Sequence, residues 1–193
     1  MDNNAVTSGC VGLSMMTETS VTPSAGRAAC IASKAWLSAA SAQPMIFSHS
    51  NPLALVEHGR NVTDEQIRAC AATGGVVCVS EVSGFPGTAT PTADDVARHA
   101  AYVARLVGVD HAGIGRDLSF HQEGLDDTPP GDFDATWWWP KSTGYDRTIS
   151  RMTYTPIETW RALASALQRA GMTGDEAARV MGGNMLRVAR QVW

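Results

Sequence analysis

The sequence has 193 residues, 44% hydrophobic and 18% charged, with a formal net charge of -4 at pH 7. This length and apolar content suit a single globular domain with a sizeable core. The negative charge, without any Lys/Arg-rich run, argues against a surface for nucleic acid or anionic membranes. No stretch is apolar enough to cross a bilayer, so we expect a cytoplasmic protein that binds neither membrane nor nucleic acid. The cysteines form no Cys-x-x-Cys pair, which favours buried thiols over a zinc knuckle or a disulfide framework: Cys10, Cys30, Cys70 and Cys78.

Residues 1–43 differ in texture from the rest of the chain. They are rich in Ser, Thr, Ala and Gly, and a helix over residues 26–42 would have only a thin apolar face. From Pro44 onward the hydrophobic pattern is much sharper. We therefore expect residues 1–43 to be an atypical leader, either poorly ordered or a single helix, and residues 44–193 to carry the fold.

Short apolar runs predict three strands, at residues 44–50, 76–80 and 111–117. Two helices separate them. Thr63 is the expected N-cap of the first, with Gln66 at the capping-box position, and Gly74 and Gly75 stop it. Thr92 is the expected N-cap of the second, which carries an apolar stripe and ends at Gly108: Val96, Ala100, Val103 and Val107.

A long segment rich in Asp, Pro and Trp, residues 118–154, follows the third predicted strand. Long segments without regular structure more often have a function than none. The run of three Trp residues in this one indicates either local packing or a pocket wall. The next helix is expected to begin with Thr155 as N-cap, Pro156 at its first position and Glu158 at the capping-box position. One or two closing helices are expected after it, with a break at Gly182-Gly183.

The predicted order β-α-β-α-β, followed by a loop and helices, is a βα repeat with a parallel sheet covered by helices. In such folds the chemistry lies at the carboxyl ends of the strands. His49 and Asp117 both lie at such ends, so they are expected to face the same side of the sheet.

Each candidate also has a structural interpretation, and the residue pattern alone leaves the choice open. His49, in "FSHSNP", suits a metal or catalytic role as well as a bond to a backbone carbonyl. Asp117 suits catalysis as well as capping of the following loop. For Arg60, just before a helix start, the pattern by itself favours a solvent-exposed charge.

The remaining histidines are weaker candidates. His58 and His121 are expected in loops and His99 within a helix, each at the surface. His111 begins the third predicted strand, at the end away from the expected site. The run "GIGRD" is no nucleotide-binding loop, because it has no third glycine and no helix after it.

Four motifs, in order, resemble the membrane dipeptidase (renal dipeptidase) family of zinc peptidases in its bacterial branch. They are "PMIFSHSNP", "RNVTDEQIRACAATGGVV", "VGVDHAGIGRDLSF" and "MGGNMLRVARQVW". The resemblance covers residues 43–193, the C-terminal part of such an enzyme. It implies an α/β fold that is part of a (β/α)8 TIM-type barrel, about its last three βα units with extra C-terminal helices. It also implies a two-zinc site at the carboxyl face, and hydrolysis of dipeptides, often with a D-residue in the second position.

The resemblance implies a role for each of three residues. His49 matches a zinc-ligating histidine, and a neutral imidazole is a good zinc ligand. Arg60 matches the arginine that grips the free carboxylate of the substrate, for which a guanidinium fork is suited. Asp117 matches the aspartate that transfers a proton from water to the leaving amine.

The sequence departs from the family pattern in two places. Many members read Gly-Asp-Phe-Asp-Gly where this chain reads Asp117-Leu118-Ser119-Phe120. The family also uses a His-x-Asp pair, a bridging glutamate and a second zinc histidine upstream, whereas this chain has no histidine before His49 and only Glu18 in residues 1–43. One hypothesis is a frameshift or misplaced start in the gene.

Two functions follow from these observations. The first is zinc-dependent dipeptide hydrolysis, impaired or absent in this chain because one histidine cannot assemble a two-zinc site. The second is a catalytically inactive barrel fragment or a non-enzymatic subunit. A partial barrel leaves strand edges exposed, so we also expect a homo-oligomer.

Overall fold

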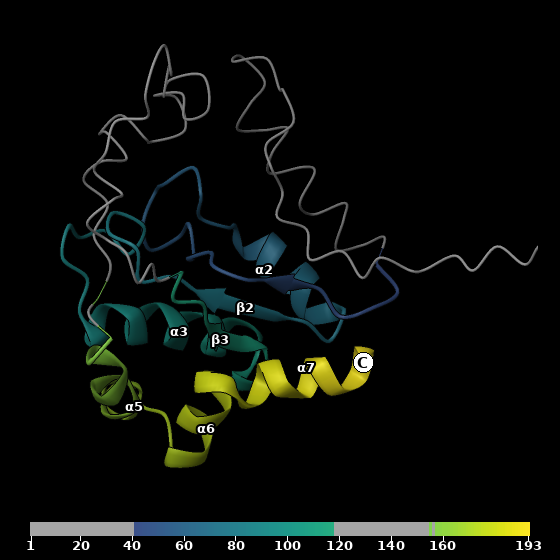
Figure 1. Ribbon diagram of the computed structural model, residues 1–193. Helices are drawn as coiled ribbons and strands as arrows, with labels where there is room; N and C mark the ends of the chain where they lie inside the picture. Colours follow the sequence, from purple (N-terminus) through teal and green to yellow (C-terminus); the bar gives the residue numbers. More distant parts are fainter. Residues whose placement is uncertain (1–40, 118–154, 156) are drawn as a thin grey trace, which may run out of the picture.

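The computed structural model describes residues 41–117, 155 and 157–193, which form a three-stranded parallel sheet with helices packed against it (Figure 1). Strand β2 is central, with β1 and β3 on either side. The elements in chain order are β1 (Ile46–Phe47), α2 (Asp64–Ala72), β2 (Val76–Val79), α3 (Ala93–Val107), the 3-10 turn η1 (Val109–His111), β3 (Ala112–Ile114), α5 (Thr159–Arg169), α6 (Gly174–Ala178), the wide π turn η5 (Arg179–Gly183) and α7 (Asn184–Val192).

The central strand explains the parallel sheet. All four residues of β2 are buried, and three of them are valines, which is typical of a strand covered on both faces. Ile46 pairs with Val76, and Val79 pairs with Ile114. The three strands therefore lie where the sequence predicts them, although β1 and β3 are shorter than their predicted ranges. The α/β class with a parallel sheet is confirmed.

Local sequence signals begin the first two helices. The Thr63 hydroxyl accepts a bond from the Gln66 backbone N–H at 3.3 Å, and the Gln66 side chain accepts one from the Thr63 N–H at 2.8 Å. Thr92 and Asp95 form the same capping box at the start of α3. Such caps stabilise a helix by about 1 kcal/mol each. Both N-cap predictions are confirmed, and so is the end of α3 at Gly108.

The two faces of the sheet carry different cores. Val77 and Val79 belong to the main core with residues of α2, α3 and α5. The alternate residues, Val76 and Cys78, face the other way and pack against Val188 of α7. In Figure 1, α7 runs beneath the sheet from α6 toward the C-terminus. The apolar stripe predicted for α3 is confirmed. Three of its residues are buried in the main core and the fourth packs against it partly buried: Val96, Ala100, Val103 and Val107.

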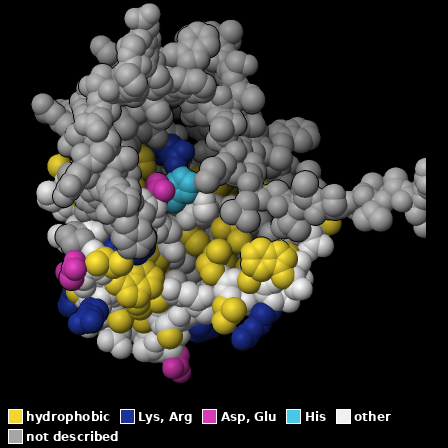
Figure 2. All heavy atoms as spheres, viewed as in Figure 1, with side chains coloured by type: hydrophobic (Ala, Val, Ile, Leu, Met, Phe, Trp, Pro, Cys, Tyr) yellow, Lys and Arg dark blue, Asp and Glu magenta, His cyan; other side chains and the backbone are white. Residues whose placement is uncertain are grey.

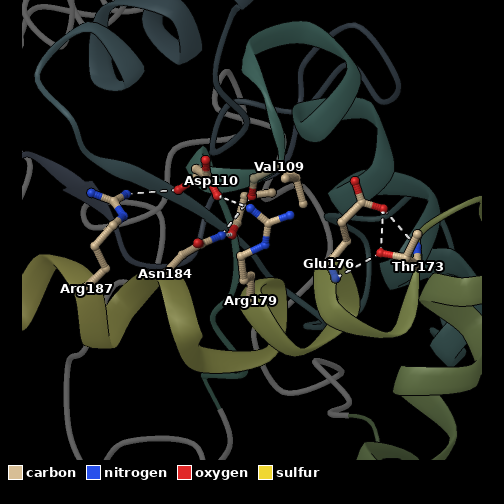
Figure 3. A network of polar contacts seen from close by, with 8 residues as sticks. Val109, Asp110, Thr173, Glu176, Arg179, Asn184 and Arg187 are labelled. Atoms are coloured by element: carbon tan, nitrogen blue, oxygen red, sulfur yellow. Dashed lines mark hydrogen bonds and ion pairs between the residues drawn. The ribbon is translucent and has the colours of Figure 1, made fainter.

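Side chains of the C-terminal helices close the amino ends of the strands (Figure 3). The Asn184 amide donates to the carbonyls of Val109 at 2.7 Å and Ala112 at 2.8 Å. Arg187 donates to the carbonyls of Gly74 at 3.0 Å and Asp110 at 2.9 Å. These carbonyls precede or begin β2 and β3, so the network ties the last helix to the amino ends of these strands.

Two local predictions are wrong. Helix α5 begins at Thr159, not after a Thr155 cap, because Thr155 is buried and its carbonyl accepts a bond from Arg116 at 3.1 Å. His99 is not at the surface but fully buried in α3, where Nε2 lies 3.3 Å from the carbonyl of Pro86. Burial is the main cause that lowers the pKa of His99 to about 4. Tertiary contacts, which no local pattern encodes, decide both.

Other predictions fare as follows. Cys70 and Cys78 are buried free thiols, as expected. The closing helices are interrupted at η5, which contains Gly182 and Gly183. His111 lies at the amino ends of the strands, with Nδ1 2.8 Å from the Gly75 carbonyl. Among the described residues, no helix is long and apolar enough to cross a membrane. Residues 1–40 of the predicted leader and the Trp-rich segment 118–154, with His121, lie outside the described residues, as does Pro156.

Candidate functional site

Charged and polar side chains follow each strand at the same edge of the sheet. His49 comes two residues after β1, Glu81 two residues after β2, and Asp117 three residues after β3. Because the strands are parallel, their carboxyl ends meet at one edge. The predicted placement of His49 and Asp117 on the same side is therefore confirmed. Glu81 is a third acidic or basic residue at this edge.

The loop after β1 is fixed to the end of β2 by a buried asparagine. The Asn51 amide accepts a bond from the Ser80 N–H at 2.9 Å and donates to the Ser80 carbonyl at 3.1 Å. The Ser50 N–H donates to the Cys78 carbonyl at 2.8 Å. Asn51 therefore continues the ladder beyond β1 and holds the residues beside His49 in place.

The backbone after β3 makes a close approach to the backbone after β1. A Cβ atom at Gly115 would lie 1.7 Å from the Ser48 carbonyl oxygen, so only glycine fits there. The Gly115 N–H also donates to the Val79 carbonyl at 2.9 Å. This contact brings the chain just before Asp117 against the chain just before His49.

His49 and Arg60 are in direct contact. Nε2 of His49 is hydrogen bonded to Nη2 of Arg60, and Nδ1 of His49 lies 2.7 Å from the Ser48 hydroxyl. Arg60 comes from the loop between β1 and α2, so a single βα unit supplies both side chains. The residue pattern favoured a solvent-exposed Arg60; the half-buried side chain corrects that interpretation.

The guanidinium of Arg60 lies against the loop that follows β2. Its central carbon is 5.8 Å from the centre of the Phe85 ring, within the range of a cation–π contact. The ring of His58 packs on the same Phe85 at 4.9 Å, and its Nδ1 accepts a bond from the Arg60 N–H at 3.1 Å. The Nε atom of Arg60 is buried and has no hydrogen-bond partner in the described structure. The guanidinium of Arg60 therefore has an N–H donor, at Nε, that no described residue uses.

Asp117 is exposed and has an unusual backbone. Its φ is 55°, and among the described residues it is the only one other than glycine with a positive φ. Aspartate tolerates this region better than most residues, yet the conformation still costs of order 1 kcal/mol, and such strain gathers at functional sites. The exposed carboxylate at the strand edge suits proton transfer, and the described structure assigns it no hydrogen bond or ion pair.

Glu81 and Arg116 form a charged pair that sequence reasoning missed. Glu81 is 3% exposed and binds Nε of Arg116. The other two nitrogens of Arg116 donate to the carbonyls of Ile157 at 3.3 Å and Thr155 at 3.1 Å. The guanidinium also lies 5.5 Å from the ring centre of Trp160. Arg116 therefore joins β2, β3 and the start of α5, directly beside Asp117.

The signal that identifies His49 and Asp117 also applies to this pair. Both Glu81 and Arg116 follow a buried strand within two residues of its end. A charged residue that directly follows a buried strand is expected at the carboxyl edge, whichever residue it is. The pairing itself, over 35 residues of sequence, has no local signature.

The described residues do not make a zinc site by themselves. Within residues 41–117, 155 and 157–193, no group of three or more His, Cys, Asp or Glu side chains is placed to hold a metal. His49 supplies one imidazole, whose Nε2 contacts Arg60. Burial raises the pKa values of Cys70 and Cys78 to about 12, so these thiols stay protonated and are poor ligands.

On the face drawn in Figure 2, a histidine is visible near acidic and basic side chains, and hydrophobic side chains gather below.

Sequence comparison identifies a family. The model of the membrane dipeptidases (Peptidase family M19) matches residues 12–130, which includes much of the segment that the sequence analysis set apart as a leader. The uncharacterized dipeptidase C965.12 of Schizosaccharomyces pombe is 30% identical over 75% of this chain and 30% of its own length. The dipeptidase ataJ of Aspergillus terreus is 29% identical over 80% of this chain and 32% of its own. The chain thus spans about a third of these curated relatives.

Solved structures give the same picture of the fold. An amidohydrolase from Pseudomonas aeruginosa superposes with a TM-score of 0.63 at 29% identity, over 82% of this chain and 49% of that protein. A metallo peptidase from Rhodobacter sphaeroides, liganded with a phosphinate mimic of the dipeptide L-Ala-D-Ala, superposes with a TM-score of 0.56. Its 19% identity, over 81% of this chain and 38% of that protein, supports likeness of fold alone.

Proposed function

Because this chain belongs to the membrane dipeptidase family (Peptidase family M19), we propose that its strand edge forms part of a zinc-dependent dipeptide-hydrolysing site. In this proposal β1, β2 and β3 are consecutive strands of a (β/α)8 barrel with α2, α3 and α5 outside it. The parallel strand order and the helix-facing core residues Val77 and Val79 support this arrangement.

The observation that carries the proposal is the half-buried Arg60 beside His49. A guanidinium that keeps an unpaired, buried Nε atom is suited to a bidentate carboxylate such as the free C-terminus of a dipeptide. Phe85 lies against the guanidinium and limits its access to water. Arg60 would thus select peptides that end within reach of the site, which is the property that separates a dipeptidase from an endopeptidase.

Asp117 and His49 have separate roles in this proposal. The exposed Asp117 carboxylate takes a proton from the attacking water and returns it to the leaving amine as the peptide bond breaks. His49 would be one ligand of a divalent metal, and the described residues do not supply the other ligands that such a metal needs. Zinc, when bound, would polarise the peptide carbonyl and activate the water. We also propose a cytoplasmic location and self-association through the outer strands of the sheet.

A test uses the whole chain, purified and supplied with zinc. We expect bound zinc and hydrolysis of free dipeptides, and a preference of about a hundredfold in kcat/KM for a dipeptide over its C-terminal amide. Arg60→Gln should remove most of that preference by slowing only the free acid. Arg68→Gln, on the exposed side of α2, is the matched control and should leave it intact.

The result that would overturn the proposal is a folded chain that holds no zinc and cleaves no dipeptide. That outcome would favour the alternative, a catalytically inactive fragment or non-enzymatic subunit. Equal loss of both substrates in Arg60→Gln would contradict the carboxylate role alone.

A further inference from the structure

A buried asparagine next to Arg60 links two loops at the carboxyl edge of the sheet. Nδ2 of Asn61 donates to the Val56 carbonyl at 2.9 Å, within its own loop, and to the Phe85 carbonyl at 3.1 Å, in the loop after β2. Only the nitrogen of an asparagine amide is a donor, so two carbonyl partners determine the orientation of this side chain. Asn61 is 5% exposed, which shields both bonds from water.

Close packing joins the same two loops. Gly87 has a φ of 88°, and a Cβ atom there would lie 2.8 Å from Cγ2 of Val56. The backbone just after Phe85 therefore lies against Val56, whose carbonyl accepts one of the two Asn61 bonds. Loss of the amide would let the loop after β2 move away from the loop that carries Arg60.

Helix α3 holds the loop after β2 from its other side. Nη2 of Arg98 donates to the Pro86 carbonyl at 3.1 Å, and Nε2 of His99 lies 3.3 Å from the same oxygen. A carbonyl only accepts, so Nε2 of the buried His99 carries a proton and donates it. The backbone of Phe85 and Pro86 is therefore fixed by Asn61 on one side and by α3 on the other.

This fixed backbone carries the ring that contacts Arg60. The centre of the Phe85 ring lies 5.8 Å from the central guanidinium carbon, and the ring of His58 packs on it at 4.9 Å. Phe85 is 4% exposed, so its ring cannot shift without moving its backbone or its close-packed neighbours. The bonds to the Phe85 and Pro86 carbonyls therefore act on the guanidinium through this ring.

We propose that Asn61 and His99 are positioning residues, which hold the Phe85 ring against Arg60 and so place the guanidinium before a substrate carboxylate arrives. A long side chain that is already placed loses less freedom on binding, which strengthens recognition. The inference rests on the proposed function, in which Arg60 binds the free carboxylate of a dipeptide. It adds that selectivity for this carboxylate depends on two residues that do not touch the substrate.

Asn184 provides a matched control at the opposite ends of the strands. It is 2% exposed, and its Nδ2 also donates to two carbonyls, those of Val109 and Ala112. Asn61→Leu and Asn184→Leu each replace a buried amide by an apolar group with the same branching, so both should destabilise the chain. Only Asn61→Leu should alter the surroundings of Arg60.

The first measurement needs neither metal nor substrate. In the whole chain labelled with ¹⁵N-arginine, Arg60→Lys identifies the Nε–H signal of Arg60, and hydrogen exchange of this signal reports its shielding from water. Nε of Arg60 is buried in the unmodified chain, so slow exchange is expected there. We expect exchange to be about tenfold faster in Asn61→Leu and to change less than about twofold in Asn184→Leu.

The second measurement follows substrate selectivity in the chain supplied with zinc. Its readout is the ratio of kcat/KM for a dipeptide to that for its C-terminal amide. We expect Asn61→Leu to lower this ratio about tenfold, by raising KM for the free dipeptide with kcat nearly unchanged. Asn184→Leu should keep the ratio of the unmodified chain, because its effect is on stability alone.

His99 gives a second pair of variants, which decides the matter if Asn61→Leu does not fold. His99→Leu removes the donor to the Pro86 carbonyl, whereas His99→Gln keeps an N–H at the same end of the side chain. Arg98 still binds this carbonyl, so a smaller effect is expected. Exchange of the Arg60 Nε–H should be about threefold faster in His99→Leu and return toward the unmodified rate in His99→Gln.

The outcomes separate this inference from the proposed function. Unchanged Nε–H exchange in Asn61→Leu and His99→Leu, with the preference for the free dipeptide intact, would overturn the inference and leave the dipeptidase proposal standing. Equally fast exchange in Asn184→Leu would assign the effect to lost stability and also overturn it. Faster exchange in Asn61→Leu alone, in a chain that hydrolyses no dipeptide, would overturn the proposed function and the substrate role of Asn61, but not its hold on Arg60.

Discussion

The two ends of the parallel sheet are built in different ways. At the amino ends, Asn184 and Arg187 of α7 donate to backbone carbonyls, and Arg179 pairs with Asp110 at 2.6 Å. The bonds of Asn184 and Arg187 hold backbone carbonyls, whereas the Arg179–Asp110 pair is exposed. At the carboxyl ends, charged side chains meet one another: His49 contacts Arg60, and Glu81 contacts Arg116.

The difference shows where stability and chemistry are located in this chain. Backbone acceptors at the amino ends are bonded by side chains of the last helix, which contributes to stability. The carboxyl ends hold a buried ion pair and a left-handed Asp117. Such features cost free energy, and proteins retain them where a site needs them. Four predictions test this contrast.

The largest effect is expected from the buried pair at the carboxyl ends. Arg116→Met would leave Glu81 as an unpaired buried charge and free the carbonyls of Thr155 and Ile157. We expect the free energy of unfolding to fall by about 3–5 kcal/mol, measured by urea titration. Arg179→Met, which breaks an exposed pair at the amino ends, is the control and should cost less than about 1 kcal/mol. Equal costs would contradict the contrast between the two ends.

The second effect concerns His99, which supports the loop after β2. Its pKa is about 4 in the folded chain because of burial first, with Arg98 also lowering it, against an ordinary value of 6.5. Between these values the unfolded chain binds the proton and the folded chain does not. Stability is therefore complete above pH 6.5 and falls as the pH decreases toward 4, by about 3 kcal/mol in all.

Unfolding measured in urea at a series of pH values tests this slope. His99→Gln removes the titrating ring and should flatten the stability profile between pH 6.5 and 4. A profile that keeps its slope in His99→Gln would assign the acid sensitivity to other groups.

The third prediction tests the hydrogen bonds of Asn184 at the amino ends of the strands. Asn184→Ala removes the donor shared by the carbonyls of Val109 and Ala112, and of these the buried Ala112 carbonyl loses its bond to the side chain. We expect the chain to lose about 2 kcal/mol of stability without any change in zinc affinity. Leu186→Ala, on the exposed side of the same helix, should change stability little. A loss of zinc affinity in Asn184→Ala would show that the two ends are not independent.

The smallest effect has the opposite sign. Asp117→Gly relieves the left-handed strain at φ 55°, partly offset by the greater freedom of glycine in the unfolded chain. We expect a gain of about 0.5 kcal/mol in stability and, under the proposed function, loss of dipeptide hydrolysis. Asp175→Gly in the first turn of the helical α6 is the control and should lower stability by about 0.5 kcal/mol. A less stable Asp117→Gly would mean that the carboxylate contributes structurally.

The sequence by itself determined the features that depend on a few neighbouring residues. The capping boxes at Thr63 and Thr92 are complete within four residues, because each requires only one turn of helix. The valines of β2 predict a buried strand, because β-branched side chains covered on both faces form a continuous apolar run. The same logic places His49 and Asp117 at one edge of the sheet.

Only the tertiary structure decided which groups meet across that edge. The Glu81–Arg116 pair joins two strand ends, Thr155 is buried under Arg116 instead of capping α5, and His99 lies under the carbonyl of Pro86. The contact of Arg60 with His49 depends on the path of the loop between β1 and α2 and on Phe85 from the next loop. Local propensity extends over one helical turn or one strand, whereas these contacts need the sheet to be assembled first, since packing between distant segments sets the direction of each side chain.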